Sequence, residues 1–183
     1  SRAMAAEALG VLGTFERSGD AATGRAQQAL RGAAELIMGR IDEADTILGA
    51  SEFDHDPEVA LWRMAIAAAR EDWPEAMHQL QRSDRVLAAY PRSLRLRLGL
   101  AAARAAIETH ETEFADTLLE QLNAAEPTPA ERARLTFLEG LAEARKGAIA
   151  TADRIWQALE QTGPADVRVD AAFARTEMLL DAG

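Results

Sequence analysis

The sequence predicts an all-α protein built from antiparallel helix pairs. Alanine and leucine are abundant, aromatic residues make up only 5% of the chain, and isoleucine, valine and threonine are sparse, which favours helices over sheets. Apolar residues recur at helical spacing in short runs, and tight breaks separate these runs. Because a short helix cannot bury its apolar face alone, two runs joined by a tight break are expected to pack as a hairpin.

The clearest pair occupies residues 132–164. Its two amphipathic runs, 132–145 and 149–161, flank the break at Lys146-Gly147-Ala148, and Pro164 closes the unit. Three further pairs with the same layout precede it. Their predicted helices span residues 21–38 and 42–50, 58–70 and 74–90, and 93–109 and 113–125.

Single helices are expected on either side of these four pairs. Residues 4–15 form an amphipathic run, which caps the first pair or completes a repeat that begins upstream. Residues 166–180 form the last helix, whose apolar residues are expected to cover the fourth pair. These residues are Val169, Ala172, Phe173 and Leu180.

Residues 94–100 alternate leucine with arginine or glycine, a period that is typical of a strand. The residues that follow, 101–108, are strongly helical in composition, and the chain offers no second strand with which 94–100 could pair. Because an isolated strand is not stable, we expect a helix here.

The pairs predict a single domain of helical repeats over residues 1–183. The chain begins at Ser1 without an initiating methionine and ends abruptly at Gly183, so we expect a fragment of a longer bacterial protein. The repeats are placed at 21–57, 58–91, 92–127 and 128–164, with a capping helix or partial repeat at 1–20 and a final helix at 165–183.

Two sets of residues recur at the period of the pairs. The closing prolines are spaced by 34, 36 and 37 residues: Pro57, Pro91, Pro127 and Pro164. An alanine of each second helix is spaced by 32, 39 and 37 residues: Ala44, Ala76, Ala115 and Ala152. A helix-pair repeat of about 34 residues with these marks resembles the tetratricopeptide repeat.

The resemblance has a physical basis. A glycine or alanine in the first helix lets the two helices approach closely, a large residue four positions after the second-helix alanine fills the gap, and the proline stops the second helix. The tryptophan and tyrosine of the family's first helix are absent, so the repeats are degenerate. The matching residues are Gly32, Ala44, Leu48 and Pro57 in the first pair and Gly140, Ala152, Trp156 and Pro164 in the fourth.

The resemblance covers residues 25–183. It implies a right-handed superhelix, or α-solenoid, of about four helix pairs with terminal capping helices. It also implies a concave groove lined by the first helices, where a partner would bind. Carrying over the inward-facing positions places residues of every first helix in the groove, and Val169 and Phe173 of the last helix as well. The candidate binding residues among them are Leu61, Arg97, Leu100, Arg104, Arg134, Phe137, Leu141 and Arg145.

The arginines of this predicted groove suggest the chemistry of the partner. Guanidinium groups bind carboxylates through two hydrogen bonds, and apolar neighbours supply contact area, so the expected ligand is an acidic-hydrophobic peptide or helix. The alternative is that the arginines are ordinary surface charges that pair with neighbouring acids. This alternative applies to Arg92, Arg95, Arg97 and Arg104.

Composition excludes several other classes of function. The formal charge of −10 opposes binding to nucleic acid or to an anionic membrane surface. The absence of cysteine rules out a disulfide framework, a thiolate metal site and a cysteine nucleophile. No apolar run approaches the length of about 18 residues that a membrane span needs, so we expect a soluble protein, either cytoplasmic or periplasmic.

Motifs for catalysis and cofactor binding are absent, among them GxSxG, GxGxxG, the P-loop and HExxH, and we expect no cofactor. The acidic stretch 52–58 has oxygens that suit a hard cation, but capping of the next helix by Asp54 or Asp56 is the favoured interpretation. The tryptophans are expected in the core, and only Trp62 is retained as a candidate exposed contact.

The leading functional hypothesis is a non-catalytic scaffold for protein–protein interaction. A second hypothesis is a self-assembling module, because an open-ended stack of helix pairs exposes the apolar face of its last helix. A third is the helical arm of an enzyme whose catalytic domain lies outside this chain. RNA binding by helix-pair repeats is a fourth, which the acidic charge disfavours.

Overall fold

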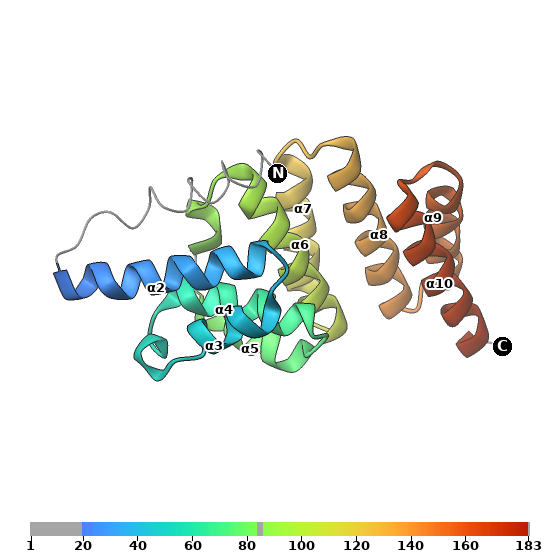
Figure 1. Cartoon of the computed structure of the whole chain (residues 1–183). Coiled ribbons are helices and arrows are strands. Elements are labelled where there is room, and N and C mark those ends of the chain that lie inside the picture. The colour runs from blue at the N-terminus through green and yellow to red at the C-terminus, as the bar shows by residue number, and fades with distance from the viewer. Residues whose placement is uncertain (1–19, 84–85, 183) are drawn as a thin grey trace. The chain divides into compact units, whose positions relative to one another are not determined.

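The computed structural model describes residues 20–83 and 86–182 (Figure 1). Within these residues the chain forms nine α-helices and two short 3-10 helices, and no strand. The all-α class is therefore confirmed, and the alternating segment 94–100 lies inside a helix, as expected. The predicted helix at 4–15 lies outside the described residues.

Contacts group the chain into two compact units, Ser1–Ala102 and Ala103–Gly183, which are considered separately. The single repeat domain expected from the sequence stays a prediction. The helices of unit 1 are α2 (Asp20–Ile37), α3 (Ile41–Leu48), η1 (Ser51–Phe53), α4 (Pro57–Ala69), α5 (Trp73–Arg82), η2 (Val86–Ala89) and the first part of α6 (Arg92–Glu108).

In unit 1, α2 packs against α3 and α4 packs against α5, so both predicted pairs form. Helix α4 also contacts α3, α2 and η2, and it is the most completely buried of these elements. An arginine on α4 holds the two pairs together. The guanidinium of Arg63 donates to the Leu48 carbonyl oxygen at 2.8 Å, to the Ala50 carbonyl oxygen at 3.0 Å and to the Asp54 carboxylate at 3.0 Å. It thus satisfies the Leu48 carbonyl at the end of α3 and adds a second donor to the Ala50 carbonyl, which also accepts from the Phe53 N–H.

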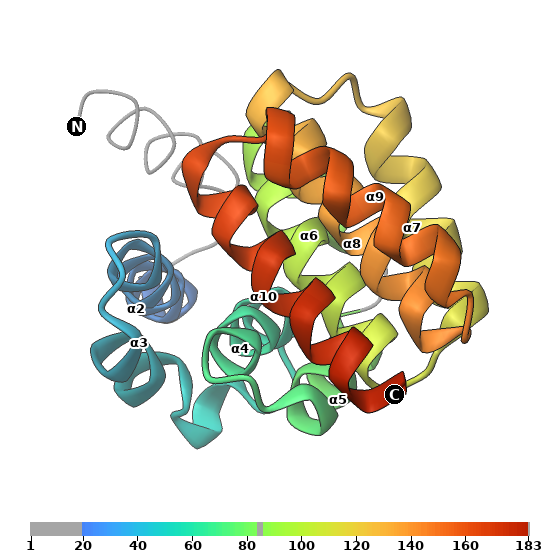
Figure 2. The same ribbon diagram turned by 90° about the vertical axis from the view of Figure 1, so that its right-hand side faces the viewer.

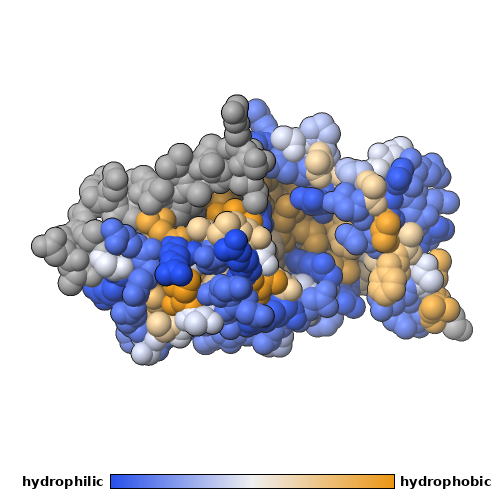
Figure 3. Space-filling view, viewed as in Figure 1, coloured by the Kyte–Doolittle hydropathy of each residue, from blue (hydrophilic) through white to orange (hydrophobic). Residues whose placement is uncertain are grey.

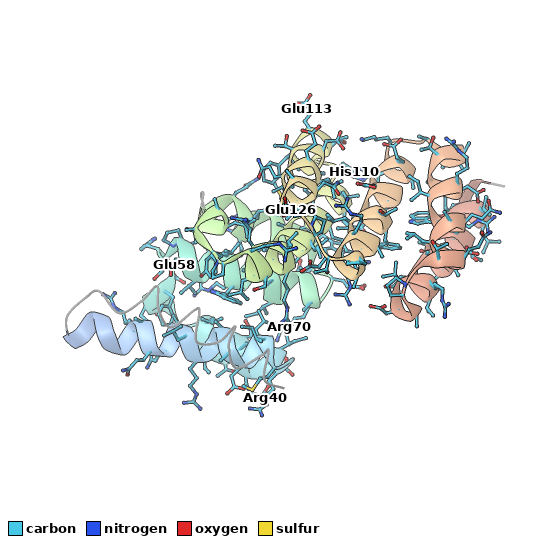
Figure 4. All side chains as sticks on the ribbon, turned by 90° about the horizontal axis from the view of Figure 1, so that it is seen from above. Arg40, Glu58, Arg70, His110, Glu113 and Glu126 are labelled. Carbon is cyan, nitrogen blue, oxygen red and sulfur yellow. The ribbon has the colours of Figure 1, made fainter. Side chains whose placement is uncertain are left out.

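A second arginine of unit 1 makes the same kind of link. Arg70, labelled in Figure 4, pairs with Asp45 at 2.6 Å and with Asp42 at 2.8 Å, and so ties the end of α4 to α3. These pairs raise the pKa of the Arg70 guanidinium, chiefly through its hydrogen bond to Asp45. Two cross-links from one helix therefore fix α3 on α4.

Unit 2 contains the rest of α6, then α7 (Thr112–Ala124), α8 (Pro129–Arg145), α9 (Ile149–Thr162) and α10 (Ala165–Ala182). Helices α8 and α9 form the predicted fourth pair, α7 packs on α8, and α10 packs on both α9 and α8 (Figure 2). The start of α8 has a capping box that the sequence analysis missed. The Thr128 side chain accepts from the Glu131 N–H, and the Glu131 carboxylate accepts from the Thr128 N–H at 2.7 Å.

All four pairs share one backbone turn between their helices. In the first pair, the N–H of Gly39 donates to the Leu36 carbonyl oxygen, and the N–H of Arg40 donates to that of Glu35. The same two hydrogen bonds recur in the other pairs, with N···O distances of 2.8–3.1 Å. The residue with positive φ in each turn is Gly39 (82°), Glu71 (58°), His110 (62°) and Gly147 (79°).

The repeated turn explains the spacing of the alanines. Each second-helix alanine lies five residues after the residue with positive φ, so both series have the spacings 32, 39 and 37. All four alanines are buried, with no more than 1% of their surface exposed: Ala44, Ala76, Ala115 and Ala152. The chain therefore has the helical-repeat character that the sequence predicts.

The two glycines of the first helices lie at points of close approach, as predicted. A Cβ atom added to Gly140 would lie 2.5 Å from Nε1 of Trp156, and one added to Gly32 would lie 2.4 Å from Cγ of Leu48. Trp156 and Leu48 are buried, and each is the large residue four positions after its alanine. The indole N–H of Trp156 donates to the Phe137 carbonyl oxygen at 3.2 Å, which fixes the ring in this gap.

Two predictions about helix ends are wrong. Pro57 does not stop the second helix of its pair, because α3 already ends at Leu48. Pro57 instead lies in the first turn of α4. Asp56 caps this helix, and its carboxylate accepts hydrogen bonds from the N–H groups of Glu58 and Val59 at 2.9 and 3.2 Å. Capping by Asp56 is thereby confirmed. The helix predicted at 74–90 ends at Arg82.

The last helix packs through a different face from the one predicted. Val167 and Ala171 are buried in α10, whereas Val169, Ala172, Phe173 and Leu180 are exposed. The expected contact of these four residues with the fourth pair is therefore wrong. Both faces of α10 carry apolar residues at helical spacing. In the observed packing, two ion pairs join α10 to its neighbours: Arg134–Asp166 at 2.8 Å and Arg175–Asp153 at 2.6 Å.

Replacement of Gly140 by alanine should destabilise the protein. The added methyl group would overlap a buried, hydrogen-bonded indole ring, a cost of about 1–3 kcal/mol that outweighs a helix-propensity gain of about 1 kcal/mol. The matched control is Gly24→Ala in α2, where nothing lies within 4 Å of the new Cβ atom and a gain of up to about 1 kcal/mol is expected. Urea unfolding followed by circular dichroism measures both. Equal stability of Gly140→Ala and the unaltered chain would contradict the role of close approach.

Candidate functional site

The predicted groove residues of unit 1 differ in accessibility. Leu61 is fully buried in α4, which is apolar on nearly all sides, so it cannot contact a partner and is removed from the candidate site. Leu100 is half-buried, and Arg97 is exposed and forms no ion pair with a described residue. Only Arg97 keeps the free charge that the predicted groove requires.

In unit 2, two predicted groove arginines share one acid. Arg104 lies 3.9 Å from the Glu108 carboxylate, and Arg145 forms a hydrogen bond with the same group. The Glu108 side chain is only 11% exposed, so it is largely enclosed by these partners. For Arg104 the alternative interpretation, a surface charge paired with a neighbouring acid, is confirmed, and Arg145 is held in the same way.

The remaining predicted residues of unit 2 also serve the packing of the helices. Arg134 binds Asp166 of α10 at 2.8 Å, and this hydrogen bond is the main reason that the pKa of Asp166 is lowered. Phe137 lies against the ring of Trp156, with 6.0 Å between the ring centroids, and Leu141 is buried. Arg134 and Phe137 thus help to hold α8 to α10 and α9, and Leu141 has little exposed surface.

A groove does exist in unit 2, and it lies between α8 and α9. It has a volume of about 1080 Å³. The residues that line it come from the first half of α8 and from most of α9: Pro129, Ala130, Arg132, Ala133, Thr136, Thr151, Arg154, Ile155, Ala158, Leu159, Thr162, Gly163 and Pro164. We call it the α8–α9 groove.

Small side chains make the α8–α9 groove hollow. Ala130 and Ala133 of α8, Ala158 of α9 and Gly163 after it line the groove, and none of them has a side chain large enough to fill it. Ile155 is half-buried and adds apolar surface, and the buried Leu159 lies beneath it with little of its surface exposed. The stretch of α8 from residue 129 to 136 is about 10 Å long at 1.5 Å per residue, which corresponds to two turns of a bound helix.

Two arginines provide the charge of the α8–α9 groove. Arg132 contacts only the Asn123 side chain, at 3.3 Å, and Arg154 contacts only the Ala150 carbonyl and the Thr151 hydroxyl of its own helix, at 3.3 and 3.4 Å. Both are exposed, and neither forms an ion pair with a carboxylate of the described residues. Their positive charge is therefore available to a ligand.

The α8–α9 groove lies on a different face from the predicted one. Residues two positions apart on a helix point about 200° apart, so Arg132 and Arg134 project from opposite sides of α8. Arg134 faces α10, and Arg132 faces the groove. Sequence reasoning missed this site, although the run of alanines and threonines on one side of α8 and α9 could have indicated a hollow.

Trp62 is not an exposed contact, so that candidate is wrong. Its indole N–H donates to the Tyr90 hydroxyl at 3.1 Å, the two rings meet edge to face with 5.9 Å between their centroids, and both side chains are buried. Contacts between η2 and α4 accompany this pairing. The pair is part of the core of unit 1.

Searches for other kinds of site give no candidate. Over residues 20–83 and 86–182, no three histidine or acidic side chains come together in a way that could hold a metal ion. Among the helices described, none combines the length and the apolar character needed to cross a membrane. No protein-family model, curated protein or solved structure matches this chain.

The Tyr90 phenol should resist ionisation while unit 1 is folded. Burial raises its pKa well above the usual value of about 10, and the nearby Glu58 carboxylate adds to the rise. The unfolded chain therefore ionises first, so the stabilisation is complete below pH about 10 and declines as the pH rises towards the folded pKa.

Tyr90 is the only tyrosine of the chain, so tyrosinate absorbance reports on it alone. We expect the tyrosinate absorbance to rise at the same pH at which the chain loses its helices, and not at a lower pH. In denaturant the Tyr90 phenol should titrate with its ordinary pKa of about 10. A titration near pH 10 with circular dichroism unchanged would show that the phenol is not buried as described.

Proposed function

We propose that this chain is a non-catalytic protein-interaction module of the tetratricopeptide type, with its pairs stacked in that family's right-handed superhelix. The turn shared by all four pairs supports this proposal, as do the buried alanines of the second helices and the close approach at Gly32 and Gly140. The proposed partner site is the α8–α9 groove. It rests on one observation, a mostly apolar groove with two arginines that no described acid neutralises.

The ligand that fits this groove is an acidic amphipathic helix. Small side chains on both walls let a helix approach closely, and apolar residues at i, i+3 and i+4 would cover Ile155 and Ala158. Carboxylates beside them would reach Arg132 and Arg154 and form charge-assisted hydrogen bonds. Helix α10 is a precedent on the other side of the same pair, because it buries Val167 and Ala171 and places an acid on an arginine of α8.

Binding of a synthetic peptide tests the proposal. The probe is a short, fluorescently labelled amphipathic helix with leucines on one face and glutamates beside them, measured by fluorescence anisotropy. The double variant Arg132→Glu/Arg154→Glu should weaken binding by roughly a hundredfold, because it removes two charge-assisted contacts and adds repulsion. Replacement of the peptide's glutamates by glutamine should have a similar effect on the unaltered chain.

A steric variant and a charge control complete this test. Ala158→Leu fills the α8–α9 groove without changing its charge, and it should also weaken binding. Arg97→Glu removes an exposed, unpaired arginine of unit 1, and it should leave the affinity unchanged. The α8–α9 groove is not the partner site if the peptide does not bind the unaltered chain. The same conclusion follows if Arg97→Glu weakens peptide binding and the double variant does not.

A further inference from the structure

Helix α10 leaves one of its faces uncovered. Val169, Phe173 and Leu180 are 69%, 68% and 75% exposed, whereas Val167 and Ala171 on the other side are buried against the helices of unit 2. In Figure 2 no other helix of this unit passes in front of α10, and apolar surface near its C-terminal end is visible at the right of Figure 3. Single exposed apolar residues are ordinary, but a continuous row of them is not.

The exposed residues form one row along the helix. At 100° per residue, they fall within an arc that lies opposite the buried face. The row consists of Val169, Ala172, Phe173, Thr176 and Leu180, at positions i, i+3, i+4, i+7 and i+11. We call it the α10 row. It has the spacing of a helix face that packs against a second helix.

Opposite charges flank the α10 row. Asp170 and Glu177 lie along one side, and Arg168 lies along the other. Arg168 and Asp170 are exposed, and neither pairs with another described residue. Arg175, on the same side as Arg168, is already bound to Asp153 and Glu160 of α9 at 2.6 and 3.4 Å.

We infer that a second copy of this chain covers the α10 row, with the two α10 helices parallel and related by a two-fold axis that runs along them. In that arrangement the acidic side of each helix meets the basic side of the other, so Arg168 of one copy reaches Asp170 of the second copy. An antiparallel pair would instead bring acid to acid and arginine to arginine. Charge complementarity therefore selects the parallel arrangement.

The parallel arrangement also matches the apolar residues. Each residue of the α10 row meets its own counterpart, so Phe173 lies beside Phe173 and Leu180 beside Leu180 of the second copy. The interface is isologous, as expected for a two-fold dimer. It uses neither Arg132 nor Arg154, so the inference does not depend on the α8–α9 groove, and each can fail without the other.

Sedimentation velocity over a range of concentrations tests the dimer. The unaltered chain should associate as its concentration rises, and Phe173→Asp should raise the dissociation constant by roughly tenfold or more. The matched control is Phe114→Asp, which removes an aromatic residue of α7 that is 40% exposed and should leave association unchanged. Circular dichroism verifies that both variants are folded. A monomer at every concentration, or a dimer that survives Phe173→Asp, would overturn the inference.

Charge exchange tests the orientation. Arg168→Asp should weaken the dimer, and the double variant Arg168→Asp/Asp170→Arg should restore it. The chain has no cysteine, so Val169→Cys introduces a single thiol at one end of the α10 row. Oxidised glutathione should convert two such thiols to an intermolecular disulfide, because parallel helices place residue 169 beside its counterpart, whereas antiparallel helices place the two at opposite ends of the row. Gln157→Cys on α9 should give none. A dimer with neither rescue nor cross-link would be antiparallel, contrary to the inference.

Discussion

The structure depends on how closely the two helices of the first and fourth pairs approach. At Gly32 and Gly140 the neighbouring helix leaves no room for a side chain, and the gap is filled from the other side by Leu48 and Trp156. The shared turn sets this register, because the residue with positive φ fixes where the second helix begins. Glycine adopts this conformation easily, and Glu71 and His110 adopt it at a cost of about 1–2 kcal/mol, which the packing of their pairs offsets.

Local features of the chain could be predicted, and long-range ones could not. The buried alanines and the glycine contacts follow from spacing within one pair, which a single sequence displays. The partners of the arginines do not: Glu108 lies 37 residues from Arg145, and Arg134 lies 32 residues from Asp166. The exposed face of α10 could not be predicted either, because both of its faces carry apolar residues and the choice depends on ion pairs with α8 and α9.

The arginines divide into two groups with different physical roles. Arg63, Arg70 and Arg175 cross-link helices, and each has at least two partners. Arg132 and Arg154 have no carboxylate within the described part of the chain. Removing a cross-linking arginine leaves carbonyls or acids without a hydrogen-bond partner. Replacing Arg132 or Arg154 by an acid instead changes only the electrostatic potential that a ligand experiences at the groove. Free charge beside an apolar hollow is therefore a better guide to a partner site than arginine content.

The two proposed surfaces lie on different helices of unit 2. Arg132 of α8 faces the groove, whereas Arg134 of α8 binds α10, the helix that carries the other surface, so the two surfaces share no residue. A dimer formed through α10 would carry two α8–α9 grooves. A partner with two acidic segments would then bind its second groove as an intramolecular step, and its apparent affinity would exceed that of one segment without any new contact. Loss of the α10 interface should therefore weaken a two-segment ligand while leaving a single peptide unaffected, a difference that separates a role in avidity from a role in the groove itself.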